Sequence, residues 1–170
     1  MKISMYQITV PVFIRFLKNL SAILKKGEEF AKAKGFEPEV LLNSRLAPDM
    51  FPLSRQIQIG CDLARRCVLR LAGLDIPAIE DNEKTFAEFY ARIDSTIATL
   101  ESIKPEQLDG TEEKMVTLKL RDATHELKGL DMVLYFSQPN VYFHVTTAYD
   151  ILRHNGVELG KKDFIGQMPV

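Results

Sequence analysis

Apolar residues recur at steps of three and four positions in four long segments of the chain, which is the spacing of amphipathic helices. The first segment predicts a helix over residues 4–35, with Ser4 as its N-cap and Gly35 as its C-cap. Pro11 lies inside this pattern and predicts either a kink or a helix that starts near residue 10. The other three segments predict helices over residues 52–73, from 81 or 82 to 103, and from between 137 and 140 to 156.

The helical pattern is interrupted between residues 105 and 138. Residues 115–120 (MVTLKL) alternate apolar and polar side chains, and 125–129 (HELKG) is a candidate partner strand. Residues 36–51 predict one short helical turn, and the tail 158–170 reads as irregular. We therefore expect an all-α fold, a four-helix bundle with a small β-hairpin insertion before the last helix, in which residues 1–170 form a single domain.

The amino-acid composition indicates which class of protein and which kinds of partner to expect. The chain has 170 residues, 46% of them hydrophobic, as expected for a globular domain. Its formal net charge of −1 provides no overall positive field, so we expect no nucleic-acid partner and no membrane partner. Cys61 and Cys67, six residues apart on one predicted helix, cannot bridge each other. A reducing, cytoplasmic location fits this cysteine content.

Two of the three histidines lie in the last predicted helix, in FHVTTAYDILRHNG (143–156). His144 and His154 are ten residues apart, about 15 Å along a helix and about 80° around it, so one metal ion cannot bind both. His154 suits the helix end, where a cation is favoured. His125 is expected to have a surface or packing role. His144 is either a hydrogen-bonded core histidine or a ligand or catalytic residue.

The start of the second predicted helix is unusually polar, with RQIQIGCD over residues 55–62. Gln56 lies one turn before Gly60, whose missing side chain allows a backbone or a ligand to approach. Gln58 and Asp62 are four residues apart and can interact on the helix surface. This stretch is either a solvated helix face or the polar floor of a pocket.

The last helix resembles that of the DinB/YfiT-like superfamily of bacterial four-helix bundles, many of which are described as metal-dependent enzymes. In that family, two histidines four residues apart precede an arginine by about nine residues, and a glycine follows three further on. Arg153 and Gly156 have this spacing from His144. The resemblance therefore makes His144 equivalent to the second family histidine and Asn140 to the first.

The resemblance extends over most of the chain. Residues 10–24, 51–62 and 139–164 look like an uncharacterised DinB-related family, known as a domain of unknown function. The third metal ligand of the superfamily is a histidine on the second helix, whereas residues 52–73 contain none. Gln58 or Gln56 occupies that region here.

The resemblance implies one pocket and several readings of it. The pocket residues would be Asn140, His144, Gln56, Gln58 and Asp62. One reading is a metal-assisted hydrolase or thiol transferase with a degenerate site, in which His144 binds a divalent metal such as zinc or nickel. The alternative is a non-catalytic module that binds an unknown small molecule or serves a stress response. A third is that these polar residues set helix register or a dimer interface, since such bundles are often homodimers.

Overall fold

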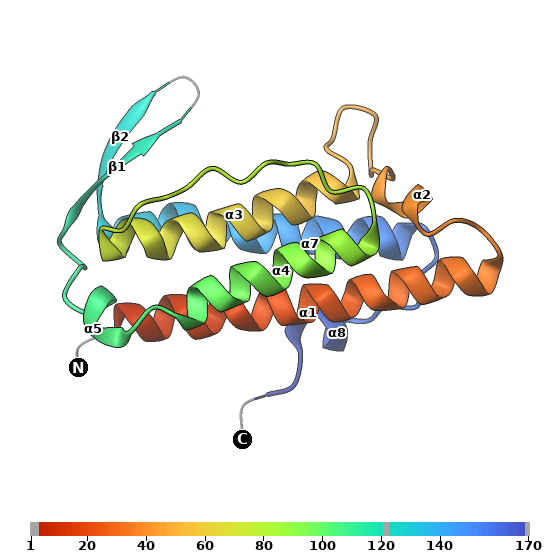
Figure 1. Cartoon of the computed structure of the whole chain (residues 1–170), viewed down its shortest axis with the longest axis horizontal. Coiled ribbons are helices and arrows are strands. Elements are labelled where there is room, and N and C mark those ends of the chain that lie inside the picture. The colour runs from red at the N-terminus through yellow and green to blue at the C-terminus, as the bar shows by residue number, and fades with distance from the viewer. Residues whose placement is uncertain (1–3, 121–122, 169–170) are drawn as a thin grey trace.

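Four long helices and a β-hairpin form the described part of the chain, residues 4–120 and 123–168 of the computed structural model (Figure 1). The long helices are α1 (Met5–Lys34), α3 (Leu53–Ala72), α4 (Phe86–Glu101) and α7 (Gln138–His154). The shorter elements are α2 (Glu39–Leu42), α5 (Pro105–Leu108), β1 (Met115–Lys119), β2 (Thr124–Lys128), α6 (Gly129–Asp131), the π-helix η1 (Met132–Ser137) and α8 (Lys161–Ile165).

The long helices do not simply alternate in direction. Helices α1 and α7 run one way, and α3 and α4 both run the other way (Figure 1). Because α3 and α4 are parallel, residues 73–85 must return along the whole length of the bundle as a crossover connection. The predicted apolar stripes meet in the interior, where side chains such as Phe13, Ile57, Phe89 and Val145 are fully buried.

Helix α1 has the caps that the sequence predicts. The Ser4 side chain accepts a hydrogen bond from the Gln7 amide, and Gly35 is left-handed with φ of 78°. The helix begins at Met5, so of the two alternatives that Pro11 predicts, a start near residue 10 is wrong. Pro11 removes only one backbone donor from a helix that is held by a long buried stripe. By length and hydropathy alone α1 could also cross a membrane, which is weak evidence because core helices share these properties.

Helix α4 starts later than the predicted residue 81 or 82. Thr85 is the N-cap, and a capping box links its side chain to the Glu88 amide and the Glu88 carboxylate back to the Thr85 amide. The carboxylates of Asp81 and Glu83, which precede α4, instead contact Arg92, a residue of α4. Residues 81–84 therefore lie outside the helix, and the side chains of Asp81 and Glu83 are used in tertiary contacts.

The hairpin and the last helix follow the predicted order. Strands β1 and β2 pair antiparallel, with Val116 opposite Leu127, and the hairpin projects from one end of the bundle (Figure 1). Helical backbone then starts at Gly129, earlier than predicted, because α6 and η1 lead directly into α7. The tail is not wholly irregular, since α8 lies across α1, where Asn19 donates to the Phe164 carbonyl.

Candidate functional site

His144 is held by a chain of hydrogen bonds that links α7 to α3. Its Nδ1 lies 2.7 Å from Gln56 Oε1, and Gln56 Nε2 donates to the Phe51 carbonyl over 3.1 Å. Because the Gln56 amide nitrogen donates to the Phe51 carbonyl, the amide oxygen of Gln56 faces the imidazole. An amide oxygen can only accept a hydrogen bond. The imidazole proton therefore sits on Nδ1, and Nε2 carries a lone pair.

The imidazole of His144 is neutral at physiological pH. The side chain is buried, with 9% of the residue exposed, and burial together with the positive charge of Arg55 lowers its pKa to about 4. In the described part of the chain Nε2 has no hydrogen-bond partner. A neutral imidazole fixed through Nδ1 can use Nε2 to accept a ligand hydrogen bond, to take up a proton or to bind a metal.

Gly60 lies where α3 packs against α7, beside this histidine. A β-carbon at Gly60 would lie 3.8 Å from His144 Cβ and 4.0 Å from Val145 Cγ2. The partner that approaches the missing side chain is therefore helix α7. This close packing brings Gln56, one turn earlier on α3, within reach of the imidazole.

One exposed aromatic ring contacts the imidazole of His144, and a second exposed aromatic residue is joined to Gln56 through its backbone. The Phe143 ring is edge-on to the imidazole, with ring centroids 5.2 Å apart, and the residue is 57% exposed. Phe51, whose carbonyl accepts from Gln56, is 56% exposed. Sequence reasoning missed both, although Phe143 lies outside the apolar stripe of its helix, which is a signal for an exposed aromatic residue.

Asn140 lies one turn before His144 on α7 but is bonded to its own helix. Its Nδ2 donates to the Phe136 carbonyl over 2.6 Å. Neither Gln56 nor His144 is hydrogen-bonded to it within the described residues. Asn140 is thus near the site by position on the helix, with its amide nitrogen already engaged.

Gln58 and Asp62 belong to a different cluster on the other side of α3. Gln58 donates to Glu83 over 2.9 Å and accepts from Arg55 over 3.1 Å. Asp62 accepts from Arg92 over 3.1 Å. The five predicted pocket residues are therefore divided between two places, with Gln56 and His144 in one, Asn140 one turn away on α7, and Gln58 and Asp62 in the other.

Arg92 is the centre of this second cluster. It is buried, and its guanidinium contacts three carboxylates, those of Asp62, Asp81 (2.9 Å) and Glu83 (2.7 Å). Arg65, also buried, donates to the Pro77 carbonyl over 3.0 Å. Because Asp81, Glu83 and Pro77 all lie in the crossover, the cluster fastens residues 73–85 to α3 and α4. Sequence reasoning gave Arg92 no role.

Comparison with known proteins identifies the family. Residues 5–165 match the model described as "Domain of unknown function (DUF1993)". This chain belongs to the DUF1993 family. The DUF1993 chain is also 44% identical to a DinB family member protein from Shewanella denitrificans, whose crystal structure it matches with a TM-score of 0.89 over 97% of this chain and 93% of that one. The fold is therefore DinB-like, as the resemblance predicts, and no curated protein matches.

The residues around His144 do not fit the metal that the DinB superfamily implies. Within residues 4–120 and 123–168, no three His, Cys, Asp or Glu side chains are grouped closely enough to bind one ion. The nearest other donors are amides, and the oxygen of Gln56 already accepts the imidazole proton. Zinc and nickel sites favour nitrogen and sulfur ligands, so one imidazole with two amides is a poor donor set.

The two cysteines of this DUF1993 chain do not supply a nucleophile. Cys61 and Cys67 are free and buried, and burial raises the pKa of each thiol to about 12. Only the thiolate is an effective nucleophile or metal ligand. Both thiols are therefore protonated core side chains, and the prediction that they do not bridge each other is confirmed.

Proposed function

We propose that this DUF1993 protein is a small-molecule-binding module in which Nε2 of His144 accepts a hydrogen bond from the ligand. The observation that carries the proposal is the 2.7 Å bond between His144 Nδ1 and Gln56 Oε1. It orients the ring and keeps the lone pair on the opposite nitrogen. A pKa of about 4 keeps that nitrogen unprotonated over the physiological range.

The surroundings of His144 favour a ligand with an apolar or aromatic body and an N–H or O–H donor. The exposed Phe143 ring lies edge-on beside the imidazole, and aromatic rings provide apolar contact with little loss of side-chain freedom. The donor group of the ligand would meet Nε2. This recognition needs no metal, which agrees with the donor set around the histidine.

A thermal-shift screen with a matched pair of variants tests the proposal. In His144→Asn, the asparagine amide nitrogen takes the place of Nδ1 and can still donate to Gln56, whereas the Nε2 acceptor is lost. We expect an aromatic amine, amide or phenol from the panel to raise the melting temperature of the wild type, because ligand at 100 times Kd stabilises by about 2.7 kcal/mol. His144→Asn should abolish the shift, and His154→Asn, on the exposed end of the same helix, should retain it.

Two results would overturn this function. One is a screen in which no compound produces a saturable shift that depends on His144. The other is stoichiometric binding of Zn²⁺ or Ni²⁺ by the purified protein, measured by calorimetry and removed by His144→Asn. That second result would favour the metal-assisted hydrolase or thiol transferase instead, because such enzymes need the ion at this histidine.

A further inference from the structure

A pocket of about 260 Å³ lies between α3 and the crossover, on the face of α3 that carries Gln58. Its lining on α3 follows the i, i+3, i+4, i+7 spacing of one helix face and comprises Arg55, Gln58, Ile59, Asp62, Leu63 and Arg66. Ile79 and Asp81 line it from the crossover, which runs beside α3 (Figure 1). This crossover pocket is therefore bounded by the two segments that Arg92 and Arg65 hold together.

The crossover cluster consists of Arg55, Arg65, Arg66, Arg92, Asp62, Asp81 and Glu83. All of its carboxylate oxygens are in use. Both oxygens of Asp81 and both oxygens of Asp62 contact arginines. Glu83 uses one oxygen for Arg92 and the other for the amide of Gln58. A cationic ligand in the pocket would therefore have to displace an arginine or an amide from every carboxylate oxygen that it contacts.

Hydrogen-bond donors, in contrast, are in excess in the crossover cluster, because four arginines share three carboxylates. Arg65, Arg66 and Arg92 lie 3.6, 3.3 and 3.1 Å from the single carboxylate of Asp62. Within the described part of the chain this is the only ion pair of Arg66, and its guanidinium forms no hydrogen bond. Nε of Arg65 and Nε of Arg92 also lack a partner there. The cluster is therefore short of one anionic acceptor.

Arg66 brings this surplus positive charge to the crossover pocket. Its side chain is 47% exposed and lines the pocket. Apolar side chains lie beside it: Leu63 and Ile59 precede it by three and seven residues on the same helix face, and Ile79, 38% exposed, lines the pocket from the crossover. The pocket thus combines a loosely paired guanidinium with an apolar surface.

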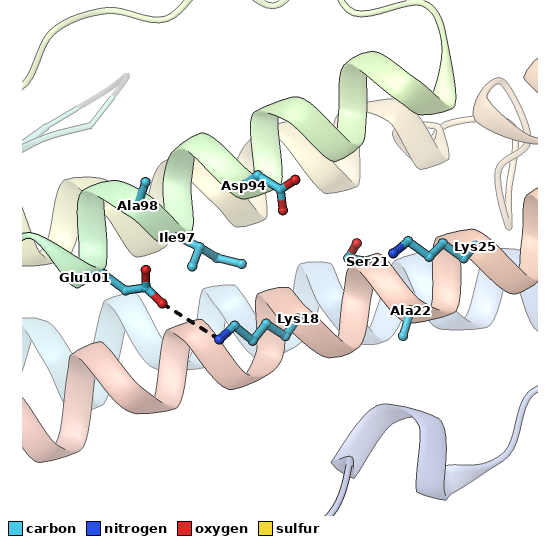
Figure 2. Close-up of a pocket in the computed structure, with 8 residues that line it drawn as sticks. All are labelled: Lys18, Ser21, Ala22, Lys25, Asp94, Ile97, Ala98 and Glu101. Carbon is cyan, nitrogen blue, oxygen red and sulfur yellow. Dashed lines mark ion pairs between the residues drawn. The ribbon is translucent and has the colours of Figure 1, made fainter.

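The groove between α1 and α4 shows that charged walls alone do not select a ligand. Figure 2 shows Lys18 and Lys25 on α1 across from Asp94 and Glu101 on α4, so charges of the two signs are equal in number. Lys18 and Glu101 are 3.8 Å apart, with side chains 62% and 56% exposed. Such a groove favours neither an anion nor a cation, whereas the crossover pocket has a surplus of one sign.

We propose that the crossover pocket binds a small carboxylate with an aliphatic body. The carboxylate pairs with Arg66, whose planar guanidinium presents N–H donors that match two carboxylate oxygens. The aliphatic chain lies against Ile59, Leu63 and Ile79. This site is separate from the one at His144 and does not rest on it, because Nε2 of His144 accepts a hydrogen bond and an ionised carboxylate has no proton to donate.

An NMR titration of the full chain with hexanoate tests the charge, and hexanamide is the neutral probe of the same shape. We expect hexanoate to bind saturably and to shift the methyl signals of Leu63 and Ile79. Hexanamide should bind about 10-fold more weakly or not at all, because the charge-assisted bond is lost. Arg66→Met should weaken hexanoate binding on the order of 10-fold for the same reason. Arg45→Met, at an exposed arginine before α3, and His144→Asn should leave it unchanged.

Acetate and the variant Ile79→Ser test the apolar part of the pocket. Hexanoate should bind more tightly than acetate because its longer chain buries more apolar surface, and Ile79→Ser should reduce this advantage. Ile79 is exposed, so the variant should fold, which circular dichroism checks. Three results would overturn the proposal: no saturable binding of hexanoate, hexanoate binding that is unchanged by Arg66→Met, or binding of hexanamide, acetate or inorganic phosphate as tight as that of hexanoate.

Discussion

Gln56 and Gln58 are two residues apart on α3, and both are buried, yet they face different parts of the molecule. Their positions differ by about 200° around the helix. Gln56 points to α7 and forms one neutral hydrogen bond with His144. Gln58 points to the crossover and joins a network of Arg55 and Glu83.

Buried polar side chains have different roles on the two faces of α3. On the α7 face, a single amide satisfies one imidazole nitrogen and leaves the other free for a ligand. On the crossover face, each acidic group meets an arginine, and the cluster holds a connection that has no regular structure of its own. Among the described residues the crossover cluster also leaves Nε of Arg65 and Nε of Arg92 without a hydrogen-bond partner, but both atoms are buried. Gln58 and Asp62 line a surface pocket of about 260 Å³ on that face, whereas the lone pair of His144 Nε2 lies on the α7 face.

The crossover face should be the more costly to disrupt. Arg92→Met keeps side-chain length but removes the charge shared by Asp62, Asp81 and Glu83. We expect a loss of about 3–5 kcal/mol in unfolding free energy, because carboxylates are left near one another without their buried cation. Arg66→Met is the matched control, since Arg66 is half-exposed and, among the described residues, forms an ion pair with Asp62 alone. Urea unfolding measures both, and a loss below about 1 kcal/mol for Arg92→Met would contradict a structural role for the cluster.

The α7 face should respond to pH. The pKa of His144 falls from 6.5 to about 4 on folding, so between these values the unfolded chain binds a proton that the native state does not. Stability contributed by the neutral imidazole is therefore complete above pH 6.5 and is lost as the pH falls towards 4. The loss should reach roughly 3 kcal/mol. It is measured as the difference between wild type and His144→Asn across this range, with His154→Asn expected to follow the wild type.

The sequence predicts the bundle well because burial on a helix is a local, periodic signal. The caps Ser4 and Gly35 and the predicted hairpin strands have the expected positions. The start of α4 was misplaced because Asp81 resembles an N-cap, whereas Arg92 uses its carboxylate across the fold. The T-x-x-E pattern at Thr85 was the better signal.

The candidate site was less predictable because it depends on which face of α3 meets which helix. Periodicity shows that Gln56 and Gln58 lie on different faces, but only the packing of α3 on α7 shows that Gln56 meets His144. Arg92 could have been suspected, since it interrupts the apolar stripe of α4 three residues after Phe89. Its three carboxylate partners come from distant positions that no local pattern connects.

A pair of glutamine variants separates the two faces directly. Gln56→Leu leaves Nδ1 of His144 without a partner in a buried place, and we expect a loss of about 1–3 kcal/mol in unfolding free energy. Gln58→Leu removes bonds to Arg55 and Glu83, each of which keeps a charged partner, so we expect about 0.5–1.5 kcal/mol. Gln56→Leu should also weaken ligand binding, whereas Gln58→Leu should not. Equal effects of both variants on binding would mean that the two faces act as one site.

The smallest expected effect on stability is that of Gly60→Ala. Whether this substitution stabilises or destabilises the fold reports how closely α3 and α7 pack. A β-carbon there meets His144 Cβ at 3.8 Å, an ordinary contact distance, so Gly60→Ala adds no clash. Alanine in a helix interior is favoured over glycine by roughly 0.5–1 kcal/mol, and we expect a small rise in melting temperature with ligand binding unchanged. Gly129→Ala is the contrast, because its β-carbon would lie 2.2 Å from the Thr111 carbonyl oxygen. Destabilisation by Gly60→Ala would show that His144 is positioned by tight packing as well as by Gln56, since the added methyl group could act only by displacing α7.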